Sequence, residues 1–173
     1  MVNLQKTMEE VLDRSKQELL KRGEVASEII IIRGEELTRE PFTFITQKHK
    51  RAQQMLLKRR VQKDVTIDAV IFKLDAWVRV IDKDDRGALE RAARTGISED
   101  PKRTEAIVIN GCTVEKEILW NQPYERKEDK SITFGEISNT DTYVSAFTEG
   151  MWTRNIDAVL ANYTVPKHNI KLW

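Results

Sequence analysis

Residues 70 to 81 read Val70-Ile-Phe-Lys-Leu-Asp-Ala-Trp-Val-Arg-Val-Ile81 and carry the clearest strand pattern of the chain. Every even position is apolar, whereas Lys73, Asp75 and Arg79 occupy odd positions between apolar residues. Alternation with a period of two is typical of a β-strand with one buried face. We therefore predict a long strand within residues 65 to 82, with one buried and one partly solvated face.

A second strand is predicted at residues 105 to 112, directly after the charged segment Ser98-Glu-Asp-Pro-Lys-Arg-Thr-Glu105. Pro101 fixes its own φ and favours an extended conformation at the residue before it. In an antiparallel sheet the two strands are neighbours, which brings the charged loop close to Trp77. The region is thus a candidate binding surface, and its residues are Asp75, Trp77, Arg79, Glu99, Asp100, Arg103 and Glu105. The alternative is a purely structural turn in which Arg103 pairs with Glu99 or Glu105.

The remaining patterns predict an alternation of helices and strands. Leu4, Met8, Val11, Leu12 and Leu19 recur at helical spacing, and Gly23 follows as a C-cap, which indicates a helix over residues 3 to 22. That helix either covers a sheet or pairs with a second copy of itself. Further strands are expected at residues 26 to 33, 41 to 46, 117 to 124 and 131 to 137, and further helices at residues 47 to 63 and 86 to 94. The segment 26 to 33 contains four consecutive isoleucines, which suit a strand buried on both faces.

This order of elements predicts an α+β fold: an antiparallel sheet of five or six strands, with an N-terminal helix and an inserted helix. The order resembles that of the profilin and roadblock architectures, a likeness of fold that implies no function. A chain of 173 residues suits a single domain over 1 to 173. Residues 138 to 173 are expected to form a C-terminal extension docked on it, with Tyr143 to Phe147 as a strand and Ile156 to Tyr163 as a helix.

Composition restricts the class of protein. The 29 Lys and Arg residues nearly balance 28 Asp and Glu residues, so binding to nucleic acid would have to arise from local clustering. One cysteine, Cys112, allows neither an internal disulfide nor a cysteine-built zinc site. The first residues lack the apolar core of a signal peptide, and no apolar run has the length of a membrane span. We therefore expect a cytoplasmic protein with no membrane partner.

Several short elements resemble a loose set of small uncharacterised bacterial and phage proteins. The elements are Ala76-Trp-Val78, the segment Ser98-Glu-Asp-Pro-x-Arg-x-Glu-Ala106 with the apolar strand after it, and Ile132-Thr-Phe-Gly-Glu136. The resemblance spans residues 26 to 137 and implies a prokaryotic or phage origin. It implies no activity and assigns no catalytic residue.

The chain offers no convincing catalytic set. A metal-dependent hydrolase or nuclease would require converging carboxylates, and Asp75 and Glu105 are the best pair for that alternative. His49 and His168 lack motif-spaced partners, and neither a Walker-type nor a dinucleotide-binding glycine motif occurs. We assign no catalytic residue, no metal ligand and no cofactor.

The helix at residues 47 to 63 concentrates positive charge and contains no acidic residue. Ala52, Met55 and Leu56 form its expected apolar face. Leu57 and Val61 lie on a different side of the helix. The cations could follow phosphates along an exposed arc or could simply be solvated. As a nucleic-acid-binding alternative, the residues are Lys48, Lys50, Arg51, Lys58, Arg59, Arg60 and Lys63.

From these observations we expect a prokaryotic or phage protein that acts as a non-enzymatic, self-associating protein-interaction module. Its partner would be another protein or a second copy of itself. Nucleic-acid binding through residues 47 to 63 and a hydrolase built on Asp75 and Glu105 are the alternatives.

Overall fold

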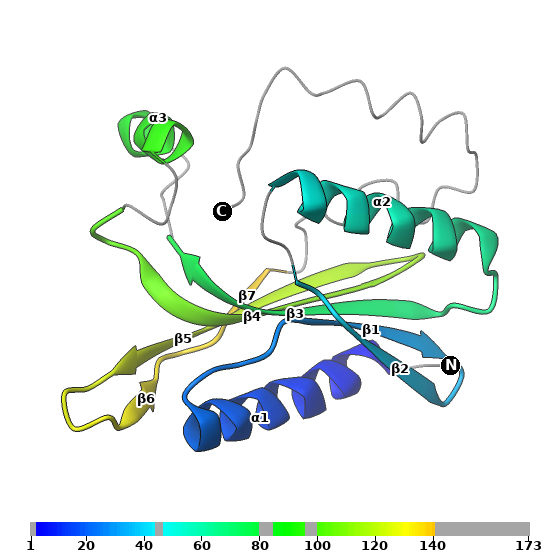
Figure 1. Ribbon diagram of the computed structural model, residues 1–173, viewed down its shortest axis with the longest axis horizontal. Coiled ribbons are helices and arrows are strands. Elements are labelled where there is room, and N and C mark those ends of the chain that lie inside the picture. The colour runs from blue at the N-terminus through cyan, green and yellow to red at the C-terminus, as the bar shows by residue number, and fades with distance from the viewer. Residues whose placement is uncertain (1–2, 44–46, 80–84, 96–99, 141–173) are drawn as a thin grey trace.

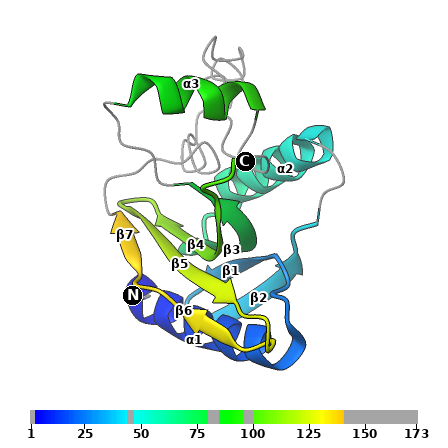
Figure 2. The same ribbon diagram turned by 90° about the vertical axis from the view of Figure 1, so that its left-hand side faces the viewer.

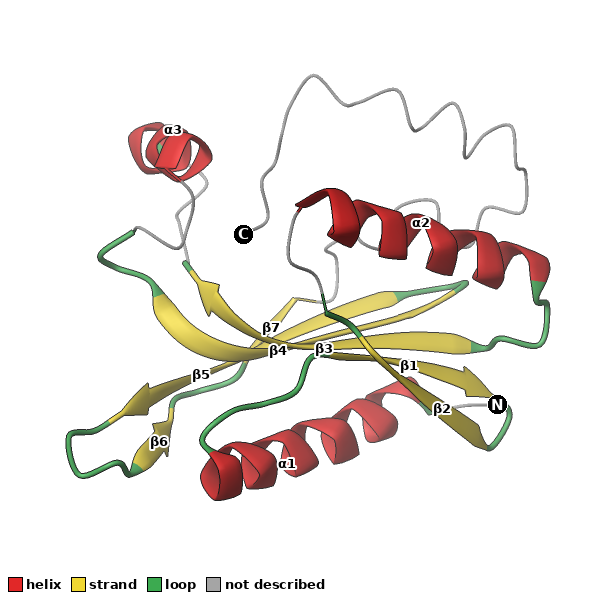
Figure 3. Ribbon diagram, viewed as in Figure 1, coloured by secondary structure: helices red, strands yellow, loops and turns green. Residues whose placement is uncertain are grey.

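The structure, a computed structural model, describes residues 3–43, 47–79, 85–95 and 100–140. Its elements are, in order, α1 (Leu4–Arg22), β1 (Glu28–Arg33), β2 (Glu36–Pro41), α2 (Gln47–Lys63), β3 (Ala69–Val78), α3 (Arg86–Thr95), β4 (Thr104–Thr113), β5 (Glu117–Arg126), β6 (Ile132–Phe134) and β7 (Ser138–Thr140). The strands form one antiparallel sheet in the order β2-β1-β3-β4-β5-β6, and β7 also pairs with β5 (Figure 1 and Figure 3).

This architecture confirms the predicted α+β class with an N-terminal and an inserted helix. The sheet has seven strands, one more than the upper expected number. The additional strand is the three-residue β7, whose polar sequence Ser138-Asn-Thr140 carries no strand pattern. The expected elements at residues 143 to 147 and 156 to 163 lie outside the described residues.

Helix α1 covers one face of the sheet, here named the α1 face, and α2 lies over the opposite face, the α2 face (Figure 1). A quarter turn in Figure 2 shows the sheet between the two helices, with α3 farther from it. The side chain of Asn3 caps α1, and Gly23 ends it in a left-handed conformation with φ of 78°, as predicted. Met8 packs so close to β4 that a Cβ on Gly111 would lie 2.5 Å from its sulfur atom. The helix therefore covers the sheet.

The predicted solvated face of β3 is wrong over the first part of the strand. Residues 69 to 74 are buried on both faces, because α1 and α2 cover opposite sides of the sheet at that position. Even Lys73, on the expected solvated side, is only 3% exposed. An alternating sequence thus forms a central strand whose single lysine is buried with its counter-ions.

The second strand is also displaced from its prediction. It spans Glu36 to Pro41 and follows β1 after a two-residue turn at Gly34, which has a positive φ of 57°. The sequence predicts a strand only from residue 41 onward, so residues 36 to 40 form a strand where none is expected. These polar residues can form a strand because β2 lies at the edge of the sheet. At an edge, side chains and the backbone groups of the unpaired side can remain in contact with solvent.

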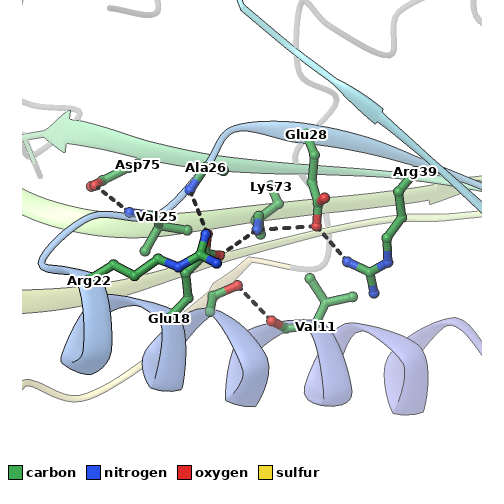
Figure 4. A network of polar contacts seen from close by, with 10 residues as sticks. Val11, Glu18, Arg22, Val25, Ala26, Glu28, Arg39, Lys73 and Asp75 are labelled. Atoms are coloured by element: carbon green, nitrogen blue, oxygen red, sulfur yellow. Dashed lines mark hydrogen bonds and ion pairs between the residues drawn. The ribbon is translucent and has the colours of Figure 1, made fainter.

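Lys73 joins α1 to the sheet through an ion cluster (Figure 4). Its Nζ atom lies 3.1 Å from a carboxylate oxygen of Glu18 in α1 and 3.1 Å from one of Glu28 in β1. Arg39 of β2 binds the same oxygen of Glu28 at 2.6 Å. The cluster links α1, β1, β2 and β3, and so positions the C-terminal half of α1 on the sheet.

None of the helices in the described ranges combines the length and the apolar composition that a membrane crossing requires.

Candidate interaction surface

Strands β3 and β4 are direct neighbours, as the sequence predicts. Their register places Trp77 opposite Glu105 and Asp75 opposite Ile107. Since side chains alternate along a strand, Asp75, Trp77 and Glu105 all project from the α1 face. The prediction that the strand with Trp77 lies next to the strand that begins near Glu105 is therefore confirmed.

Arg103 stacks on the exposed tryptophan. Its guanidinium carbon lies 4.3 Å from the ring centroid of Trp77, whose surface is 40% exposed. A guanidinium at this distance is attracted electrostatically by the indole π-system. Within the described residues Arg103 makes no ion pair, so its N–H groups have no carboxylate partner there.

A proline-containing turn places Arg103 in this position. The backbone N–H of Arg103 donates to the carbonyl of Asp100 at 3.1 Å, which closes a turn with Pro101 at its second position. The carboxylate of Asp100 accepts the N–H of Lys102 at 2.8 Å. The same carboxylate lies 3.3 Å from Nε of Arg79 at the end of β3. The turn is therefore attached to both strands that flank it.

A buried tyrosine supports the surface from β5. The hydroxyl of Tyr124 donates to Asp75 at 2.7 Å and lies 3.3 Å from Glu105. Burial, together with the hydrogen bond to Asp75, raises the pKa of Tyr124 well above its usual value. The hydroxyl therefore stays protonated and acts as a donor at physiological pH.

Arg126 connects this network to the end of α1. Its Nε atom donates to both carboxylate oxygens of Glu105, at 3.2 and 3.1 Å, and its Nη1 atom donates to the carbonyl of Gly23 at 2.6 Å. Asp75 in turn accepts the N–H of Val25 at 3.4 Å. The carboxylates of Asp75 and Glu105, which lie next to Trp77 on β3 and β4, are thus held by side chains from β5 and by the backbone after α1.

We name Trp77, Arg79, Asp100, Arg103 and Glu105 the Trp77 surface. The structure brings together these five predicted residues and Asp75, whereas Glu99 lies outside the described residues. Tyr124 and Arg126 are not among the residues predicted from the sequence. Both lie at even positions of β5, and the register that sets them beside Glu105 cannot be derived from the sequence of β5 alone.

The carboxylates of Asp75 and Glu105 do not form a metal centre with the residues described. Tyr124 contacts both, and Arg126 pairs with Glu105. Across the described ranges, no group of three or more His, Cys, Asp or Glu side chains could hold a metal ion. The geometry therefore assigns the two carboxylates to a hydrogen-bonded network.

Helix α2 has the predicted bounds, but the side that packs against the sheet is not the predicted apolar face. Leu57 and Val61 are buried against the sheet, whereas Leu56 is 64% exposed. The expected apolar face of Ala52, Met55 and Leu56 is wrong because the sheet covers the opposite side.

The cations of α2 divide into two groups as a result. Lys50 is 5% exposed, and burial lowers its pKa to about 8. Arg60 pairs with Glu40 of β2, and Lys58 is half-buried. The exposed cations are Lys48, Arg51, Arg59 and Lys63.

Comparisons with protein-family models, with curated proteins and with solved structures find no match to this chain. The fold and the surface define an α+β protein whose open antiparallel sheet carries an exposed tryptophan with an arginine stacked on it. The resemblance over residues 26 to 137 stays a prediction.

Proposed function

We propose that the protein is a non-enzymatic interaction module that binds protein, including a second copy of itself, through the Trp77 surface. The observation that carries this proposal is the partly exposed indole of Trp77 with the guanidinium of Arg103 stacked 4.3 Å from its centre. Tryptophan and arginine are the residues that most often dominate the energy of protein interfaces.

The rigidity of the surface supports the proposal. The stack orders the long side chain of Arg103, and the Asp100 turn and the Tyr124 network hold the residues around it. Ordering a flexible side chain on binding costs about 0.5–1.5 kcal/mol, and a surface ordered beforehand avoids part of that cost.

The charges of the region suit contact between two copies. Arg79, Arg103 and Arg126 balance Asp75, Asp100 and Glu105, so the region and its copy would not repel each other. A two-fold interface brings the same patch of both subunits together, which requires such self-complementarity. The carboxylates of Asp75 and Glu105 add to this rigidity, because they hold the side chains of Tyr124 and Arg126 in place beside the Trp77 surface.

Sedimentation of the wild-type protein and of Trp77→Ala over a range of concentrations tests the proposal. We expect a dimer whose dissociation constant rises at least about 30-fold in Trp77→Ala, the effect of losing about 2 kcal/mol at an interface hot spot.

The matched control is Val114→Ala in the turn between β4 and β5. Val114 is 67% exposed, and it lies at the opposite end of β4 from Glu105. The control variant should dimerise like the wild-type protein. A wild-type protein that stays monomeric at its highest accessible concentration would contradict self-association.

A further inference from the structure

The cations of α2 that face solvent lie on one side of the helix. We name Lys48, Arg51, Leu56, Arg59 and Lys63 the outer face of α2, all of them exposed. At about 100° per residue, its four cations fall within an arc of about 120°. The helix contains no Asp or Glu, and within the described residues none of these four cations takes part in an ion pair.

The opposite side of α2 fixes the direction of this arc. Leu57 and Val61 pack into the core with Phe42, Val70 and Phe72 of the sheet layer. Helix α2 lies over the sheet (Figure 1), and because Leu57 and Val61 face the sheet, the exposed side chains of the outer face point away from it. Four positive charges are thus presented together on a rigid element.

We propose that the outer face of α2 binds the phosphate backbone of nucleic acid without regard to base sequence. The fifteen-residue separation of Lys48 and Lys63 corresponds to about 22 Å along the helix axis, which spans several phosphates of one strand. Arginine guanidinium groups match phosphate oxygens in a bidentate geometry, and lysines add point charge.

Two features of the face favour this ligand over others. The helix carries no Phe, Tyr or Trp on which a base could stack, so the contacts would be mainly to the backbone. Of the large apolar residues on this side of the helix, Leu56 is exposed and Met55 is half-buried, which is too little for the apolar core of a protein interface. A nucleic-acid backbone carries negative charges at regular intervals, and the outer face of α2 places positive charges at intervals along the helix.

Fluorescence anisotropy with labelled duplex DNA, duplex RNA and single-stranded DNA tests the proposal. The oligonucleotides should be about 20 base pairs or nucleotides long, which exceeds the length of the helix. With four phosphates neutralised, the logarithm of the binding constant should fall against the logarithm of salt concentration with a slope of about −3 to −4. Binding of any of the three supports the proposal, and the preferred one identifies the nucleic acid.

The neighbouring arginines of α2 provide a matched pair of variants. Arg59 lies on the outer face, whereas Arg60 pairs with Glu40 of β2. Arg59→Gln and Arg60→Gln each remove one positive charge from the same helix. Arg59→Gln should weaken binding and make the salt slope shallower by about 0.9, and Arg60→Gln should leave the slope unchanged. Circular dichroism and thermal melting confirm that each variant is folded.

Three results would overturn the proposal. The first is no binding of any oligonucleotide at low salt. The second is an equal loss of affinity in Arg59→Gln and Arg60→Gln, because net charge rather than this face would then be responsible. The third is displacement of the oligonucleotide by polyglutamate at equal charge concentration, which would assign the face to acidic protein segments. Trp77→Ala should bind nucleic acid like the wild-type protein, so the two proposals can fail separately.

Discussion

The ammonium group of Lys73 in β3 lies 3.1 Å from a carboxylate oxygen of Glu18 in α1, across the interface between the first helix and the sheet (Figure 4). Lys73 is almost completely buried, and Glu28 of β1 binds the same ammonium group at 3.1 Å. A lysine at this position requires both carboxylates, since an unpaired buried charge costs several kcal/mol. The cluster therefore connects the docking of α1 to the pairing of three strands.

Replacement of Lys73 by methionine should lower the free energy of unfolding by about 3 kcal/mol, because Glu18 loses its buried cation and Glu28 keeps only Arg39. Urea unfolding measures the change. Arg22→Ala is the control, since Arg22 pairs with Glu18 at 3.8 Å but its side chain is 69% exposed. That variant should lose less than about 0.5 kcal/mol. Equal losses in the two variants would contradict a special role for the buried cluster.

The stability of the protein should depend on Glu18 in acid. Burial raises the pKa of Glu18, but hydrogen bonds from Lys73 and from the backbone N–H of Ala26 outweigh it, and the pKa lies below its ordinary value. A carboxyl group with a lowered pKa in the folded state stabilises the fold above its unfolded pKa, near 4.3. That contribution disappears as the pH falls through the folded pKa.

Urea unfolding of the wild-type protein and Glu18→Gln at a series of pH values from about 6 to 3 tests this sign. The stability advantage of the wild-type protein should be full at the upper end of the series and should shrink toward the lower end. An advantage that stays constant or grows in acid would show that the carboxylate form of Glu18 does not stabilise the fold.

Tyr124→Phe should destabilise the protein by about 1–2 kcal/mol, because Asp75 loses its shortest hydrogen bond beside the Trp77 surface. In an Asp75→Ala background the same change should cost much less, since the acceptor is already absent. Chemical denaturation of the four proteins gives the coupling energy directly. A coupling near zero would mean that the hydrogen bond adds nothing to the network.

The elements that the sequence predicts best are those whose signals are local. The periodic apolar residues and Gly23 define α1, and four consecutive isoleucines define β1. In both elements the residues that determine burial and capping are close together in the sequence. Register is a property of two strands at once. The meeting of Tyr124 with Asp75 and Glu105 therefore could not be derived from any one segment.

The packing side of helix α2 also could not be derived from its own segment of sequence. Its sequence offers two weak apolar sides, one with Ala52, Met55 and Leu56 and one with Leu57 and Val61. Periodicity alone favours the first because it has more members. The sheet selects the second, where Leu57 and Val61 contact the apolar α2 face and Arg60 reaches Glu40 at the edge strand.

Adjacent leucines of α2 test which side packs. Leu57→Ala should cost about 2–4 kcal/mol, because Leu57 is buried in the core against β-strand residues and its truncation leaves a cavity. Leu56→Ala removes the same atoms from an exposed position and should change the unfolding free energy by less than about 0.5 kcal/mol. Thermal and urea unfolding of the two variants compare them directly. A larger loss in Leu56→Ala would mean that α2 lies on the sheet through its cationic side, and the outer face of α2 would then be unable to bind phosphates.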